Sequence, residues 1–122
     1  LLSENVFRAA DALIVPVIPT TLSERTLDQL TEFCKKKSLA HLRLLPFFSM
    51  VDQRKSLHRE TMQRLPERYP ELLQTQIPFA AEIERMGVER SPVRTYAPNS
   101  RGAHAFGELW DEVRSLVHAR LD

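Results

Sequence analysis

Two apolar runs separated by a helical pattern constrain the fold of this chain more than any other feature. Residues 12–19 read ALIVPVIP, and residues 41–51 read HLRLLPFFSMV. The first run is continuously apolar and contains β-branched residues, a pattern typical of a strand buried on both faces, as in a parallel sheet. The second run is a further strand candidate and also contains a proline, Pro46. Between them, residues 21–37 place apolar side chains at helical spacing. The order strand, helix, strand predicts two parallel strands joined by a helix.

A proline inside the first run bears on where that strand ends. Proline has no N–H to donate to a sheet, so it is confined to edge strands or to the ends of strands. The strand that contains Pro16 therefore either lies at an edge of the sheet or ends near Val15. We expect it to end near Val15.

Two helix starts carry capping signals. Thr21 and Glu24 have the T-x-x-E spacing of a capping box, in which each side chain satisfies a free backbone donor. Ser56 is placed to cap a helix in residues 56–69, which we expect to end around Pro66 or Pro70.

The rest of the chain completes an alternating pattern. A short helix precedes the first strand, and residues 72–79 are expected to form a third strand. A long irregular passage then leads to a final helix that begins near Ser100. The apolar stripe predicted for that helix consists of Ala103, Phe106, Leu109, Trp110, Val113, Leu116 and Val117. Alternation of strands and helices predicts an α/β fold, a parallel sheet with flanking helices, in a single domain over residues 1–122.

Composition is that of an ordinary globular chain, with 43% hydrophobic and 27% charged residues. Cys34 is the only cysteine, which fits a reducing compartment, and it lies on an apolar helical stripe where we expect it to be buried. No apolar run is long enough to span a bilayer, and the first residues do not resemble a signal peptide. These features predict a cytoplasmic protein without a membrane segment.

The chain shows no complete catalytic motif. It contains neither G-x-x-x-x-G-K-[S/T] nor G-x-G-x-x-G, and no Cys/His spacing resembles a zinc site. The four histidines are dispersed, and surface positions are expected for His58, His104 and His118, which lie at predicted helix ends.

Three strings, in order, resemble parts of one protein family. They lie in residues 9–30, 47–65 and 75–113, and the most specific is a Y-x-P-x-S-x-G-A string formed by Tyr96, Pro98, Ser100, Gly102 and Ala103. Together they resemble the C-terminal half of ParA/MinD-type (Soj-like) partition ATPases. These are deviant-Walker P-loop proteins, and their wider group includes cobyrinic acid a,c-diamide synthase and nitrogenase iron protein. The resemblance covers nearly the whole chain.

The resemblance implies a layered α-β-α P-loop NTPase fold, of which residues 1–122 would be the C-terminal portion without the P-loop half. The whole protein would bind ATP with Mg²⁺ and act in chromosome or plasmid segregation or in cargo positioning. The 122-residue chain alone would be inactive and would bind no cofactor tightly. Strand ends are where ligands of open α/β sheets bind. The residues implied at the nucleotide are Ser49, Ile77, Pro78, Phe79, Pro19, Thr20 and Thr21.

The same resemblance implies a homodimer, nonspecific DNA and a ParB-like protein as partners. The DNA or partner surface would consist of Arg54, Lys55, Arg85 and Arg101. Glu82 stands where DNA-binding members often carry arginine. Two other hypotheses remain open: an ATP-dependent amidoligase of the cobyrinic acid a,c-diamide synthase type, and a non-catalytic interaction module.

Overall fold

The computed structural model describes the backbone of residues 2–121 and the side chains of residues 4–118. Its elements, in chain order, are α1 (Leu2–Ala9), β1 (Ala12–Val17), α2 (Thr21–Lys36), β2 (Arg43–Phe48), α3 (Ser56–Arg68), α4 (Ala81–Glu84), α5 (Met86–Glu89), α6 (Val93–Tyr96) and α7 (Arg101–Leu121).

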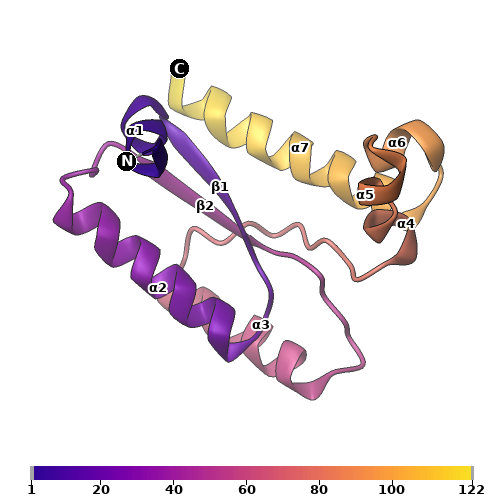
Figure 1. The fold of residues 1–122 in the computed structure, drawn as a ribbon. Coiled ribbons are helices and arrows are strands. Elements are labelled where there is room, and N and C mark those ends of the chain that lie inside the picture. The colour runs from indigo at the N-terminus through magenta and orange to yellow at the C-terminus, as the bar shows by residue number, and fades with distance from the viewer. Residues whose placement is uncertain (1, 122) are drawn as a thin grey trace.

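A parallel pair of strands forms the middle layer, with β1 paired to β2 from Ala12 opposite Arg43 to Val17 opposite Phe48. Helices α2 and α3 cover one face of this pair, and α7 crosses the other face (Figure 1). The predicted α/β class, a parallel sheet with flanking helices, is confirmed for the part of the chain that the structure describes.

The prediction that the first strand ends near Val15 is wrong, because β1 continues through Pro16 to Val17. The hydrogen bonds explain how the proline is accommodated. The Ser49 N–H donates to the Val17 carbonyl at 2.9 Å, so alternate residues of β1 face β2. Pro16 belongs to the other set, and the N–H that it lacks would point away from β2. The edge position is therefore the correct alternative.

The predicted third strand lies in the expected place but is not a regular strand. Residues 72–79 run along the free edge of β2, where the Leu73 and Ile77 N–H groups donate to the carbonyls of Pro46 and Phe48 at 2.8 and 2.9 Å. Its regular pairing is limited to a bridge between Val51 and Pro78.

A carboxylate of α7 explains the irregular course of this segment. The N–H groups of Gln74 and Thr75 donate to Glu112 at 2.8 and 2.9 Å. These donors are therefore satisfied by a side chain, and the segment is tied to the helix instead of being laddered along β2.

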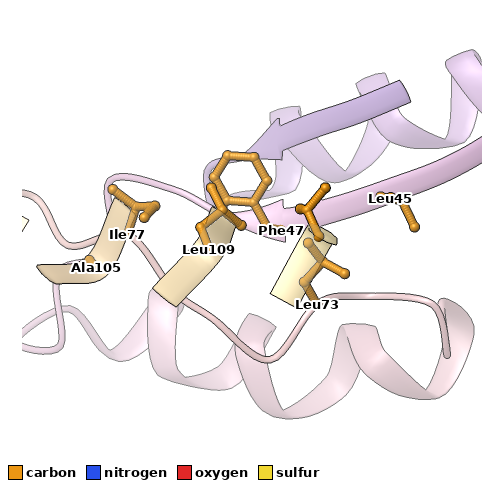
Figure 2. Close-up of a cluster of buried hydrophobic side chains, with 7 residues drawn as sticks. Leu45, Phe47, Leu73, Ile77, Ala105 and Leu109 are labelled. Carbon is orange, nitrogen blue, oxygen red and sulfur yellow. The ribbon is translucent and has the colours of Figure 1, made fainter. Parts of the chain in front are cut away.

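The hydrophobic core has one part on each face of β2. Between β2 and α7, Phe47 and Leu45 pack with Leu109 and with the segment along the edge of β2, as Figure 2 shows. The next residue, Phe48, points to the opposite face and packs with Leu65 of α3. This alternation buries β2 on both faces. Burial on both faces is predicted for the first strand, and that prediction is wrong, because β1 is only partly buried and 44% of the surface of Ile14 is exposed.

A third cluster joins α1 and α2. Cys34 is buried there with Leu39 and Leu42, as expected from its place on the apolar stripe of α2. Burial raises the pKa of its thiol, so the thiol remains protonated and unreactive at neutral pH.

The helix from Ser56 extends past the first proline. Pro66 lies inside α3, which ends at Arg68, just before Tyr69 and Pro70. The helix begins at Ser56 as expected, but its N-cap residue is Lys55, without a side-chain bond.

The capping box predicted for α2 is wrong. Thr20, not Thr21, is the N-cap, and its hydroxyl accepts a hydrogen bond from the Ser23 N–H at 3.3 Å. Glu24 turns away to α3, where its carboxylate accepts two hydrogen bonds from Arg64, at 2.9 and 2.8 Å, and a further one from Arg68. The hydrogen bonds from Arg64 are the main reason that the pKa of Glu24 is lowered.

Replacing this carboxylate should weaken the contact between α2 and α3. We expect Glu24→Gln to lower the free energy of unfolding by about 1–3 kcal/mol, less than for a fully buried pair because both arginines stay half exposed. The folded pKa lies below the ordinary value of 4.5, so the stabilisation is present above that pH and is lost as the pH falls through the folded pKa. Urea denaturation of the parent and of Glu24→Gln between pH 7 and pH 3 measures the difference in their free energies of unfolding.

The matched control is Glu32→Gln on the same helix. Glu32 is exposed and forms only a 3.9 Å pair with Lys35, so its change should be within about 0.5 kcal/mol. Equal losses in both variants would contradict the role assigned to Glu24.

The passage between residues 80 and 100, predicted to be irregular, forms three four-residue helices, α4, α5 and α6. Its polar residues secure it to the start of α7. Ser100 caps α7 by accepting from the Ala103 N–H at 3.2 Å, and Glu82 accepts from the Gly102 N–H at 3.1 Å. The Tyr96 hydroxyl donates to the Glu82 carbonyl. We call these residues, Glu82, Tyr96, Ser100 and Gly102, the helix-start cluster.

Glycine is required in this cluster because α4 approaches closely. A Cβ atom added at Gly102 would lie 2.7 Å from Cγ1 of Ile83 and 3.1 Å from Cγ of Glu82. The Y-x-P-x-S-x-G-A string therefore has a structural explanation: it docks α4 to α6 onto the first turn of α7.

Two alanine substitutions in α7 should have opposite effects. We expect Gly102→Ala to lower the free energy of unfolding by about 1–3 kcal/mol through overpacking against α4. Gly107→Ala meets no atom within 4 Å and should raise it by about 0.5–1 kcal/mol through helix propensity. Thermal and urea denaturation compare the two, and stabilisation by both would show that α4 does not pack as described.

Candidate functional site

Two cavities lie where the chain leaves β2. The larger, of about 490 Å³, lies between residues 51–54, the Pro78–Phe79 segment and the start of α7, and we call it the strand-end cavity. The smaller, of about 140 Å³, is lined by Thr20, Lys55 and His58, and we call it the α2-side cavity. Asp52 and Phe79 line both cavities, so the two adjoin.

The backbone between β2 and these cavities is strained. Met50 has φ of 53°, a left-handed conformation that non-glycine residues adopt rarely. Met50 also lines the α2-side cavity. Such conformations persist where the surrounding structure enforces them, and they concentrate at functional sites.

His58 holds the loop that follows β2. The sequence predicts a surface position for it, which is wrong, because only 4% of its surface is exposed. Its Nδ1 accepts a hydrogen bond from the Asp52 N–H at 3.0 Å. Because Nδ1 is the acceptor, the neutral ring carries its proton on Nε2. The residue therefore fixes the start of the loop and lines the α2-side cavity.

Asp52 and Arg54, which both line the strand-end cavity, form an ion pair with each other. Nε and NH2 of Arg54 donate to the two oxygens of Asp52 at 3.0 Å each, and the Arg54 N–H donates to the same carboxylate at 3.0 Å. The side-chain hydrogen bonds from Arg54 lower the pKa of Asp52 to about 2. Asp52 is thus ionised at neutral pH, and Arg54 is largely neutralised by it.

Removing the imidazole acceptor should loosen this loop. We expect His58→Leu to lower the free energy of unfolding by about 1–3 kcal/mol, because the Asp52 N–H loses its partner. The Asp52 amide should then exchange its hydrogen faster. His58→Asn keeps an acceptor oxygen near the position of Nδ1 and should retain more of the protection. Amide exchange by NMR measures both, and equal protection in His58→Leu and the parent would refute the role of this bond.

Three of the residues implied at a nucleotide line the cavities. Pro78 and Phe79 line the strand-end cavity, and 44% of the surface of Phe79 is exposed. Thr20 lines the α2-side cavity at the N-cap of α2.

The other four residues lie elsewhere. Ile77 is 1% exposed and belongs to the core between β2 and α7, and Pro19 is fully buried. Ser49 is half buried and lines neither cavity, and Thr21 is exposed in the first turn of α2 and also lines neither. The strand ends are therefore near the site, but their inward-facing side chains serve the core.

The four cations predicted for a DNA or partner surface are divided. Arg54 and Arg101 line the strand-end cavity and Lys55 lines the α2-side cavity. Arg85 lines neither and forms an ion pair with Glu89 at 2.9 Å. Since Arg54 and Arg85 are both paired with carboxylates, Lys55 and Arg101 are the members of this set available to a ligand anion.

Sequence reasoning missed the buried histidine although a signal was present. His58, Thr61 and Leu65 form the buried side of α3, at spacings of three and four residues. That spacing is the period of one helical face, and it places His58 on the same side as the core leucine.

The described residues contain no group of three or more His, Cys, Asp or Glu side chains that could hold a metal ion. Within the same part of the chain, no helix has the length and apolar character needed to cross a membrane. Comparisons with protein-family models and with curated proteins find no match for this chain. The interpretation of the site therefore depends on its own geometry.

Proposed function

We propose that this chain binds an adenine nucleotide across the two adjoining cavities, as the C-terminal part of a ParA-type partition ATPase that segregates DNA or positions cargo. The observation that carries the proposal is the position of exposed Phe79 and Arg101 in one cavity at the carboxyl end of β2. Ligands of open α/β sheets bind outside the carboxyl ends of the strands. The resemblance of the sequence to this family gives the nucleotide its identity.

The strand-end cavity suits the base. Its volume of about 490 Å³ lies within the range of small-molecule sites, roughly 300–1,000 Å³. Phe79 offers an aromatic surface for stacking, and Gln76 and His104, which also line the cavity, supply polar groups for the edge of a base. Base stacking on an aromatic side chain contributes about 1–3 kcal/mol.

The α2-side cavity is better suited than the strand-end cavity to bind the phosphates of the nucleotide. The first turn of α7 offers little to an anion, because the Gly102 and Ala103 N–H groups already donate to Glu82 and Ser100. The α2-side cavity combines the Lys55 side chain with Thr20 at the start of α2. A cation beside a helix N-terminus favours a phosphate.

Hydrolysis is not expected from these residues alone. Phosphoryl transfer depends on a P-loop, its lysine and a metal ion that neutralise the transferred group. The chain has no P-loop motif, and its described residues contain no group of three or more His, Cys, Asp or Glu side chains that could hold a metal ion. In a longer ATPase these components would come from the other half of the domain.

Nucleotide binding should be weak and should depend on Phe79. We expect ATP to shift the amide signals of Gln76, Phe79 and Arg101 in NMR titrations. Phe79→Ala should weaken binding by about tenfold or more through the lost stacking surface. Val6→Ala, an exposed apolar change on α1, should leave the affinity unaltered. Equal affinity in Phe79→Ala and the parent would refute the proposed site.

A phosphate-release assay tests separately whether the chain hydrolyses ATP. The purified 122-residue chain should release no phosphate from ATP in the presence of Mg²⁺. Turnover above the background of a heat-denatured sample would show that the chain contains catalytic groups of its own.

A further inference from the structure

A second and larger hollow lies on the opposite side of the start of α7. It has a volume of about 1,060 Å³ and separates the first half of α7 from the α5–α6 segment, and we call it the α7 groove. It shares only His104 with the strand-end cavity among the lining residues of the two. It is therefore a separate surface, and its interpretation does not depend on nucleotide binding.

The exposed tryptophan is the most unusual feature of this groove. The sequence predicts Trp110 on the buried stripe of α7, which is wrong, because 60% of its surface is exposed. Leu109 and Val113 instead face β2 and fill the core. Trp110 turns toward the groove, where Phe106 and Met86 also contribute apolar surface. Tryptophan is enriched at the centres of protein interfaces, so a hollow lined in part by an exposed tryptophan is a candidate interaction site.

Two of the charged side chains that line the groove are arginines without a partner among the described residues. Arg90 and Arg94 both line it, and within the described part of the chain neither has a hydrogen-bond or ion-pair partner. The acidic residue on its wall, Asp111, is paired with Arg114 at 3.4 Å. Arg90 has φ of 50°, so its backbone is held in a left-handed conformation that non-glycine residues adopt rarely.

This combination favours a peptide over a nucleic acid. Tryptophan, methionine and arginine are the residue types enriched in protein interfaces, whereas lysine is depleted there, and the groove has no lysine. Nucleic-acid backbones are bound by clustered Lys and Arg and need no apolar surface between them. Here two arginines lie beside an apolar wall formed by Trp110 and Phe106.

We propose that the α7 groove binds a short acidic peptide segment of a partner protein that carries one large apolar anchor. The anchor packs on Trp110 and Phe106, and flanking carboxylates pair with Arg90 and Arg94. Arginine is well suited to this because its planar guanidinium binds carboxylates with two parallel hydrogen bonds.

Selection from a random twelve-residue peptide display library on the immobilised chain tests the proposal. We expect enrichment of peptides with a net negative charge and a shared Leu, Ile, Phe or Trp position. Synthetic versions should change the fluorescence of Trp110, the only tryptophan of the chain. The double variant Arg90→Glu/Arg94→Glu should bind these peptides about tenfold or more weakly. Trp110→Ala, measured with a labelled peptide, should lose a similar amount of affinity.

The matched control is Arg25→Glu/Lys36→Glu, which makes the same charge change at exposed positions of α2 and should leave the affinity within about twofold. Circular dichroism checks that every variant is folded. The proposal is overturned by failure to enrich any peptide, by enrichment of basic peptides, or by equal losses in the control.

Two alternative occupants are tested with the same proteins. In sedimentation experiments, we expect the parent chain to show no self-association that depends on Trp110. Self-association that Trp110→Ala abolishes would assign the groove to a second copy of the chain. A labelled single-stranded oligonucleotide should bind the parent and the Arg90→Glu/Arg94→Glu variant alike. Loss of its binding in the variant alone would assign the groove to nucleic acid and overturn the proposal.

Discussion

Burial of β2 on both faces and along both edges is the constraint on which the rest of the structure depends. Phe47 packs toward α7 and Phe48 toward α3, so the strand needs a helical layer on each side. Its two edges are occupied by β1 and by the segment at residues 72–79. A strand covered in this way leaves its carboxyl end as the open position, and the two cavities form there.

The long connection before α7, residues 80–100, holds the start of that helix in place and also forms part of the molecular surface. Glu82, Tyr96, Ser100 and Gly102 join it to the first turn of α7 and satisfy donors that the helix itself leaves free. As a result the Gly102 and Ala103 N–H groups are already occupied, and an anion near the start of α7 depends mainly on side chains such as Arg101. The same docking holds α5 and α6 apart from the exposed side of Trp110 and so creates the α7 groove.

The candidate site could be located from the sequence to the correct end of the sheet but not to the correct side chains. A strand end predicts a ligand position because parallel strands finish at one edge. Which side chain of a strand end faces outward depends on its neighbours: Phe79 lines the cavities, and Ile77, two residues earlier, fills the core. The four predicted cations likewise do not form one surface, because Arg54 and Arg85 form ion pairs with nearby carboxylates.

The sequence by itself determined the order of elements from α1 to α3, the final helix, the burial of Cys34 and the parallel α/β arrangement, because local periodicity reports which side of each element avoids water. Only the tertiary structure decided the partners of the polar residues and the exposure of Trp110. Glu24 meets Arg64 across 40 residues, and Glu112 meets Gln74 across 38. Such pairs depend on how separate elements pack against each other. The apolar period of one helix does not show which neighbouring element, if any, will cover an apolar side chain such as Trp110 that lies beside the core-facing ones.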